Sequence, residues 1–372
     1  VPLFVFMGNV VSATGMGEDA YDVANQAFRK IKGGLAIGTV GANAVFAAIT
    51  GISIASAAVF TKIAVPHMIR FGYSPRFSVG VVAGSSVLGM LIPPSLLLIL
   101  YGILTEQSIG DLFVAAIIPG ILLATVFGLG IFILSFFWSS LVFNERQKKG
   151  SHIELMKFSE FFWKSFPLVF LIVVVLGGIY GGVFTPIEAG AIGSLGAVLV
   201  GLFKRRLTFK ILWEVLVETG YITAAISFLI IAAQMYARML ALSGMPAEFG
   251  SFVVGSELSI MTMIILYIVL VIIMGTILDS GSIMLILVPL MYPILVSLNI
   301  DLIWFGIVTV IAVEVGLLTP PLGISVFVIK SSLDDKSISL GDIFLGAAPF
   351  AVMMVVVLFL VITFPILTTA LL

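Results

Sequence analysis

The sequence predicts an all-α integral membrane protein built from two inverted repeats, each with discontinuous helices and one re-entrant hairpin. Three observations lead to this prediction: an apolar composition, a repeated Pro-Pro motif and a one-sided distribution of positive charge. Hydrophobic residues make up 61% of the 372 residues and charged residues only 10%, against about 25% charged in soluble domains. Several apolar runs reach the roughly 20 residues that cross a bilayer, among them 112–143, 166–184, 258–278 and 343–372.

The internal repeat is centred on two Pro-Pro motifs. The run GMLIPPS at 89–95 resembles GLLTPPL at 316–322, at an offset of 227 (316 − 89). Downstream, SIGDLF at 108–113 resembles SLGDIF at 339–344. Matches that keep their order and nearly the same spacing indicate a duplicated unit.

The repeat divides the chain into three parts. We assign residues 1–142 to the first repeat, 143–160 to a cytoplasmic linker and 161–372 to the second repeat. Residues 161–230 hold two crossings and an amphipathic stretch that have no counterpart in the first repeat. We therefore expect an N-terminal segment of that kind to precede Val1 in the natural protein.

Two kinds of interruption occur in the apolar segments. The Pro-Pro motifs break residues 77–104 and 303–330, and we predict that each of these segments is a re-entrant hairpin. The segments 34–65 and 258–297 exceed one straight span and are interrupted at 51–53 and 278–281, so we predict broken crossings there. The expected crossings are 1–14, 34–65, 113–142, 162–183, 187–203, 219–241, 258–297 and 344–371.

The distribution of Lys and Arg orients this topology. One side carries fourteen: Arg29, Lys30, Lys32, Arg146, Lys148, Lys149, Lys157, Lys164, Lys204, Arg205, Arg206, Lys210, Lys330 and Lys336. The other side carries three, namely Lys62, Arg70 and Arg76. The positive-inside rule makes the first side cytoplasmic. The first hairpin then enters from the periplasm and the second from the cytoplasm, so the repeats are inverted.

The helix breaks predict a binding site. A bilayer core tolerates non-helical backbone only where it lines a cavity or is buried in protein. At such breaks helix N-termini attract anions, and free carbonyls at helix C-termini can coordinate Na⁺. Hydroxyl and carboxylate oxygens, the ligands that hard cations prefer, stand beside the breaks at Ser53, Ser95, Thr276, Asp279 and Thr319.

These features have other interpretations. Pro-Pro and Gly-Ser pairs also kink helices that merely pack together, and small residues are common in membrane helix contacts. An intramembrane enzyme would need paired Asp, Ser-Lys or a His-Glu metal motif, and none appears in the sequence. Without Cys there is no thiolate metal site, and no basic tract indicates nucleic-acid binding.

Short motifs occur along the whole chain. In the first half they are VPLF with Met7-Gly8, GGLA at 33–36, Gly72-Tyr73, IPPS at 92–95, Tyr101-Gly102, Ser108-Ile109 with Leu112-Phe113, and Pro119-Gly120. In the second half they are GGIYGGVFTP at 177–186 with Glu188-Ala189, Gly275, Asp279, Pro289, Pro293, Phe305-Gly306, and LTPP at 318–321 with Gly323. Together and in this order, the motifs resemble one family, the large membrane subunit of tripartite ATP-independent periplasmic (TRAP) transporters. Ile187 and Glu314 depart from the family pattern, which usually has Thr and Asn there.

The resemblance implies a function as well as a fold. It implies an elevator-type transporter of the bacterial inner membrane that takes up a small organic anion, such as a dicarboxylate or a sialic acid, together with Na⁺. Its implied partners are a small membrane subunit, a periplasmic solute-binding protein and the lipid bilayer. The alternative is a stand-alone ion-coupled carboxylate transporter of similar architecture that needs no binding protein.

These arguments give two sets of candidate site residues. The predicted substrate-binding residues are Asn43, Pro94, Ser95, Arg238, Thr319 and Pro320. The predicted Na⁺-site residues are Gly51, Ser53, Gly89, Pro93, Gly275, Thr276, Asp279, Ser280, Thr319, Pro321 and Gly323.

Four charged residues have roles that stay open. Asp279 could instead cap the amides of residues 280–282, and Arg238 could extend its charge to the membrane surface from a helix end. Glu188 and Glu314 are intramembrane acids without an assigned role.

Overall fold

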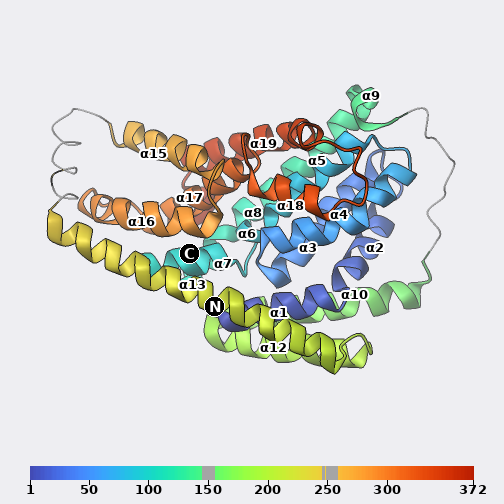
Figure 1. Cartoon of the computed structure of the whole chain (residues 1–372), viewed down its shortest axis with the longest axis horizontal. Helices are drawn as coiled ribbons and strands as arrows, with labels where there is room; N and C mark the ends of the chain where they lie inside the picture. The colour runs from blue at the N-terminus through green and yellow to red at the C-terminus, as the bar shows by residue number, and fades with distance from the viewer. Residues whose placement is uncertain (145–155, 245–247, 249–258) are drawn as a thin grey trace.

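The computed structural model describes residues 1–144, 156–244, 248 and 259–372 (Figure 1). Within these ranges the chain is helical and forms no β-strand, which confirms the all-α class. Most of the predicted 143–160 linker, with Arg146, Lys148 and Lys149, lies outside the described residues.

Nine helices make up the part before the linker: α1 (Pro2–Ala13), α2 (Met16–Phe28), α3 (Gly34–Thr50), α4 (Ser53–Arg70), α5 (Pro75–Ser86), α6 (Leu88–Leu91), α7 (Leu96–Thr105), α8 (Ile109–Phe137) and α9 (Ser139–Val142). The helices described after it are α10 (Phe158–Ile172), the π-helical turn Val173–Gly177, α11 (Gly178–Tyr180), α12 (Pro186–Phe203), α13 (Phe209–Ser243), α15 (Ile260–Gly275), α16 (Ser280–Ser297), α17 (Leu302–Leu317), α18 (Ile324–Ser332), α19 (Leu340–Thr363) and α20 (Ile366–Thr369).

Among the described residues, seven helical segments are long and apolar enough to cross a membrane. They are Pro75–Thr105, Ile109–Phe137, Phe158–Tyr180, Pro186–Phe203, Phe209–Leu240, Ser280–Ser297 and Leu340–Thr363. The amphipathic stretch expected at 207–218 and the crossing expected at 219–241 form one continuous helix, α13. The two interrupted Pro-Pro segments contain the most buried helices: every residue of α17 from Trp304 to Leu317 is buried, and so is every residue of α5 from Phe77 to Ser86.

The second Pro-Pro segment, α17 and α18, crosses the molecule and is not the hairpin predicted for 303–330. At its start, the indole nitrogen of Trp304 donates to the Val361 carbonyl oxygen at 2.9 Å, near the end of α19. At its end, Lys330 Nζ donates to the Ile338 carbonyl oxygen, just before the start of α19. The segment therefore runs from one end of α19 to the other, with its interruption in the middle.

The first Pro-Pro segment, α5 to α7, crosses in the same manner, so the hairpin predicted for 77–104 is also wrong. Arg76 Nη2 lies 2.7 Å from Asp342 Oδ1, in the first turn of α19. Tyr101 Oη donates to the Leu302 carbonyl oxygen at 2.6 Å, and that residue lies at the opposite end of α19. Figure 1 shows α5, α6 and α7 following one another across the molecule.

The first hairpin is instead formed by α3 and α4, which lie side by side in Figure 1. Gly33, before α3, packs against Ser135 near the end of α8. After α4, the Ser74 amide donates to the Val142 carbonyl oxygen at 2.8 Å, just beyond the end of α8. Both ends of the pair therefore lie on one side, and the chain reverses at Gly51.

The second hairpin is formed by α15 and α16. Helix α15 runs parallel to α17, with Tyr267 Oη 3.3 Å from Thr309 Oγ1 and Gly275 against Gly316. Helix α16 returns and ends at Ser297, a short turn before α17 begins. Both ends of this hairpin therefore lie at the end of the molecule where α17 starts, opposite the ends of the first hairpin.

The wrong prediction that the Pro-Pro segments form the hairpins has a simple physical origin. Pro stops a helix because it lacks an amide hydrogen and its ring clashes with the preceding turn, but the chain can then continue in the same direction. Gly51 has φ +65°, a left-handed conformation that commonly ends helices and redirects the chain. Arg70 and Arg76 consequently lie on the side that holds most Lys and Arg, which strengthens its cytoplasmic assignment. The two repeats are inverted as predicted, with the entry sides of the hairpins exchanged.

A buried ion pair attaches α2 to the connection between α12 and α13. The side chain of Asp19 is 2% exposed, and its Oδ2 lies 2.6 Å from Lys204 Nζ and 2.9 Å from Arg206 Nη1. Removing one partner of such a cluster leaves the remaining charges uncompensated.

We expect Asp19→Ala to lower the free energy of unfolding by about 3 kcal/mol, because it leaves Lys204 and Arg206 without their shared counter-ion. Asp22→Ala is the control, since Asp22 pairs with Lys164 through side chains that are 27% and 24% exposed; that change should lower it by about 1 kcal/mol or less. Denaturant unfolding of the purified protein in detergent measures both. Equal losses would contradict the assigned role of Asp19.

Candidate functional site at the helix breaks

The tip of the first hairpin is fastened to the first Pro-Pro break. The Leu96 amide donates to the Gly51 carbonyl oxygen at 3.2 Å. A Cβ on Gly51 would collide with the carbonyl oxygen of Pro94, and one on Gly89 would lie 2.9 Å from the Ser53 amide nitrogen. Glycine is required at both positions because backbone meets backbone there. The structure thus brings Gly51, Ser53, Gly89 and Pro94 together.

Ser95 belongs to the same tip, but its hydroxyl is already engaged. Its oxygen accepts from the Leu98 amide at 3.3 Å and so caps α7, and the hydroxyl donates to the Met90 carbonyl oxygen. The side chain is fully buried. Ser95 therefore shapes the break, and the predicted direct contact with a substrate is not needed to explain its position.

The second tip repeats this arrangement. The amides of Leu322 and Gly323 donate to the Thr276 carbonyl oxygen at 3.2 and 3.1 Å. A Cβ on Gly275 would lie 2.7 Å from Gly316 Cα, so at this point the hairpin and α17 meet backbone to backbone. The Thr319 hydroxyl donates to the Val315 carbonyl oxygen at 2.7 Å. In both halves, then, a backbone carbonyl at a hairpin tip accepts hydrogen bonds from amides of the segment that follows a Pro-Pro pair.

Asp279 caps the second arm of the second hairpin. Its Oδ2 accepts from the Ser282 amide at 3.0 Å, and its Oδ1 accepts from the Ser282 hydroxyl. This is the capping arrangement that the sequence left open as an alternative. A carboxylate has about four acceptor positions, so these two bonds leave capacity for a cation. Ser280, the first residue of α16, is buried beside it.

Two predicted substrate residues are placed elsewhere. The Asn43 amide nitrogen donates to Ser85 Oγ at 2.7 Å and to the Thr39 carbonyl oxygen at 3.3 Å, so it joins α3 to α5 two turns away from the tip. Arg238 is exposed on α13, and among the described residues it takes part in no ion pair. Neither side chain is brought to the tips, because both lie on continuous helices away from the breaks.

The four helices that begin at the breaks differ at their N-termini. Helices α7 and α16 are capped by Ser95 and Asp279, whereas α4 and α18 have no side-chain cap. Helices α4 and α18 pack against each other. Each of these two helices therefore presents free amides at a positive dipole end.

Buried hydroxyls without partners lie on the same two helices. Ser53 and Ser56 Oγ on α4 and Ser325 Oγ on α18 are buried and make no hydrogen bond. Buried polar groups are almost always paired, so such atoms suit a ligand. The sequence interpretation missed Ser56 and Ser325; their only sequence signal was their distance of a few residues from a break.

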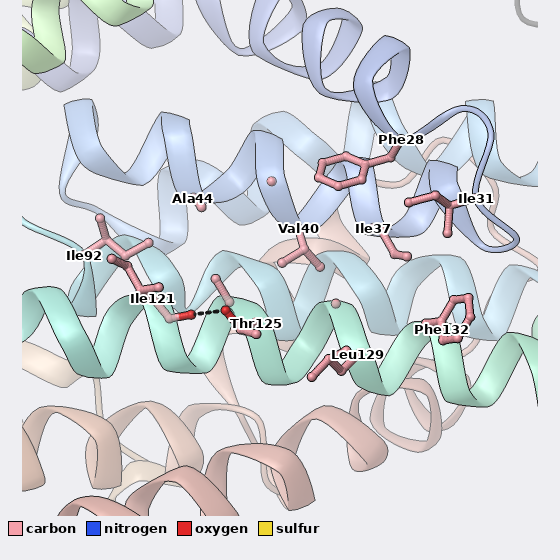
Figure 2. Close-up of a pocket in the computed structure, with 13 residues that line it drawn as sticks. Phe28, Ile31, Ile37, Val40, Ala44, Ile92, Ile121, Thr125, Leu129 and Phe132 are labelled. Carbon is pink, nitrogen blue, oxygen red and sulfur yellow. Dashed lines mark hydrogen bonds between the residues drawn. The ribbon is translucent and has the colours of Figure 1, made fainter. Parts of the chain in front are cut away.

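One described pocket does not suit an anion. It lies between the α2–α3 region and α8, has a volume of about 620 Å³ and is lined by apolar side chains from Phe28 to Phe132 (Figure 2). Thr125 is its one hydroxyl residue, and that hydroxyl donates to the Ile121 carbonyl oxygen at 2.7 Å. The candidate site is therefore the pair of tips and not this pocket.

Comparison with known proteins identifies the family. Residues 1–367 match the family model described as "Tripartite ATP-independent periplasmic transporter, DctM component". The chain belongs to this family. It is thus a multi-pass protein of the bacterial inner membrane and a transporter component, not an enzyme, as the sequence predicted.

Named relatives of this TRAP permease differ in their solutes. It is 33% identical over 375 residues to the C4-dicarboxylate TRAP transporter large permease protein DctM of Pseudomonas aeruginosa, covering 100% of this chain and 85% of the relative. It is 30% identical over 366 residues to the sialic acid TRAP transporter large permease protein SiaM of Vibrio cholerae, covering 98% and 83%. It is 30% identical over 329 residues to the 2,3-diketo-L-gulonate TRAP transporter large permease protein YiaN of Escherichia coli, covering 87% and 75%.

A solved structure shares the fold. The crystal structure of the Alcanivorax borkumensis YdaH transporter superimposes with a TM-score of 0.67 over 98% of this chain and 84% of that one. At 14% identity the likeness concerns the fold.

Proposed function

We propose that this permease imports a small organic anion together with Na⁺, and that a periplasmic binding protein delivers the anion. A small membrane subunit completes the complex. In this proposal a moving domain that holds both tips carries the site past a fixed scaffold, as in an elevator.

The observation that carries the proposal is the pair of uncapped helix N-termini at the breaks. The first amides of α4 and α18 are free of side-chain caps, and the two helices pack together beside the unpaired hydroxyls of Ser53, Ser56 and Ser325. Amides and hydroxyls donate hydrogen bonds, and helix N-termini attract negative charge. The named relatives carry C4-dicarboxylate, sialic acid and 2,3-diketo-L-gulonate, all of which are acids.

Na⁺ coupling is supported by the opposite ends of the broken helices. Helices α3 and α15 end at the hairpin tips, where the C-terminal end of each helix dipole carries partial negative charge. Carbonyl, hydroxyl and carboxylate oxygens suit a hard cation, and Thr276, Asp279 and Ser53 supply them at the tips.

The packing of the helices supports the division into a moving domain and a fixed scaffold. Helices α10, α12 and α13 contribute few residues to the core, and α13 is exposed along most of its length. They lie with α1 along the lower side in Figure 1, while both hairpins and both broken crossings lie above them. A largely apolar exposed surface of this kind fits lipid or another membrane subunit.

Uptake by reconstituted protein tests the proposal. The substrate is first identified by its thermal stabilisation of the matching periplasmic protein in a screen of organic acids. Proteoliposomes that hold this chain and its small subunit should then accumulate that acid only when the binding protein and a Na⁺ gradient are both supplied. Robust uptake without the binding protein would instead establish a stand-alone transporter, and equal uptake in a K⁺ gradient would rule out Na⁺ coupling.

A further inference from the structure

The apolar pocket of Figure 2 has the depth of a single bilayer leaflet. Its lining residues on α8 run from Ile121, near the middle of the helix, to Phe132, close to the end of the helix at Phe137. The rise between them (132 − 121 residues) is about 16 Å, which is about half of the hydrocarbon core of a bilayer. This end of α8 lies on the side that holds most Lys and Arg, so the pocket occupies the cytoplasmic half.

The wall of the pocket suits a hydrocarbon chain. Helix α8 contributes the exposed side chains of Ile121, Leu129 and Phe132, and α3 contributes Val40 among others. The hydroxyl of Thr125 is bonded to a carbonyl oxygen of its own helix and is not offered to a ligand. An exposed apolar surface of this shape is best covered by an equally apolar group.

Three cations stand at the mouth of the pocket, in the connection between α2 and α3. Phe28 and Ile31 line the pocket, and Arg29, Lys30 and Lys32 stand between and after them in the chain. Lys30 and Lys32 are exposed, and no ion pair among the described residues includes any of the three cations. The connection therefore has an apolar set of side chains toward the pocket and a basic set that is free for an anion.

Contacts at its two ends fix the direction of the pocket. At the surface end, Lys32 Nζ lies 5.6 Å from the centre of the Phe136 ring, one turn beyond Phe132 on α8. At the inner end, Ile92 directly precedes the first Pro-Pro pair, and a Cβ on Gly120 would lie 3.0 Å from Ile92 Cγ1. The pocket therefore leads from a basic cytoplasmic surface to the first helix break.

We propose that an anionic phospholipid of the cytoplasmic leaflet inserts one acyl chain into this pocket and places its phosphate against Arg29, Lys30 and Lys32. Basic segments next to the membrane attract the anionic lipids of this leaflet. The inserted chain touches Ile92 and supports the first break from the lipid side. A membrane helix of another subunit would follow the whole hydrocarbon core, whereas the pocket ends halfway, at Ile92 and Ile121.

Native mass spectrometry of the purified complex with its small subunit tests the acyl-chain site. The complex is titrated with phosphatidylglycerol or phosphatidylcholine of equal chain length, and the wild type should bind one phosphatidylglycerol more tightly than any phosphatidylcholine. Gly128→Leu should lose this lipid, because a Cβ there meets only Ile37, at 3.9 Å, and the rest of the side chain fills the pocket. Gly220→Leu is the matched control on α13, where a Cβ meets no atom of the described residues within 4 Å, and it should bind lipid as the wild type does.

The double variant Lys30→Gln with Lys32→Gln tests the headgroup contact. Each basic residue near the membrane surface strengthens the binding of anionic lipid, so the pair should weaken phosphatidylglycerol binding at least about tenfold and leave phosphatidylcholine binding unchanged. Lys157→Gln with Arg205→Gln removes two other exposed cations from the same side of the protein. That control should keep the preference for phosphatidylglycerol.

Equal phosphatidylglycerol binding by Gly128→Leu and the wild type would overturn the proposal, and so would equal binding of the two lipids by the wild type. Dissociation of the small subunit from Gly128→Leu, without loss of a bound lipid, would overturn it as well and assign the pocket to that subunit. If Gly128→Leu does not fold, the double Lys variant decides. An unchanged preference for phosphatidylglycerol in that variant overturns the proposal.

Discussion

Gly51→Ala is expected to abolish solute uptake in proteoliposomes, because the tip of the first hairpin can no longer reach the first Pro-Pro break. A Cβ at this position would collide with the Pro94 carbonyl oxygen, and relief of that collision would break the hydrogen bond from the Leu96 amide to Gly51. Two costs add. A left-handed conformation costs a non-glycine residue about 1–2 kcal/mol, and overpacking costs about 1–3 kcal/mol more.

Gly244→Ala separates these two costs. Gly244 also has a positive φ, +75°, but a Cβ there would meet no atom of the described residues within 4 Å. It should therefore lose about 1–2 kcal/mol of stability and keep normal uptake per folded molecule. Thermal unfolding in detergent and uptake of the identified acid are measured for both variants. Similar uptake in the two variants would show that the close approach at the tip is not needed for transport.

Asp279→Asn is expected to abolish the stimulation of uptake by Na⁺ while leaving most of the protein folded. Asn is nearly as good a helix cap as Asp, so the bond from the Ser282 amide can persist. The negative charge that would attract a cation at the second tip is lost. Uptake measured in NaCl and in KCl, normalised to the amount of folded protein, gives the result directly.

Asp301→Asn is the control for this change. Asp301 is likewise an Asp that caps a helix, accepting from the Ile303 and Trp304 amides at 2.8 and 3.0 Å, but it lies at the far end of α17. It should retain the full Na⁺ stimulation. If Asp279→Asn also retains the full Na⁺ stimulation, the role of Asp279 is limited to capping α16.

Part of the candidate site could be predicted from the sequence because helix breaks in a bilayer are costly and therefore conspicuous. The breaks at Gly51, Pro93-Pro94 and Pro320-Pro321 lie where the sequence indicated, and the fourth, at residues 276–279, partly overlaps the predicted 278–281. The pairing of each hairpin tip with a Pro-Pro break, through the Leu96 and Gly323 amides, could not be predicted. Those bonds join segments tens of residues apart, and local patterns carry no information about such contacts.

The positions of Arg238, Ser56 and Ser325 likewise could not be predicted from local sequence patterns. Arg238 was expected at the site because a cation within a span is unusual, yet it lies exposed on α13. Ser56 and Ser325 were not expected there, because isolated Ser residues are common in membrane helices. They became candidates only when the structure showed them buried without a partner.

The sequence by itself determined that the chain is an all-α membrane protein with two inverted repeats and four helix breaks. Composition and local backbone chemistry suffice for this, since apolar length, Pro and Gly act within a few residues of where they stand. Only the tertiary structure decided which breaks reverse the chain. Residues 34–70 and 260–297 turn back, and the two Pro-Pro segments cross. The direction after a break depends on which distant helix the chain packs against, and that is settled by contacts such as Tyr101 with Leu302 and Trp304 with Val361.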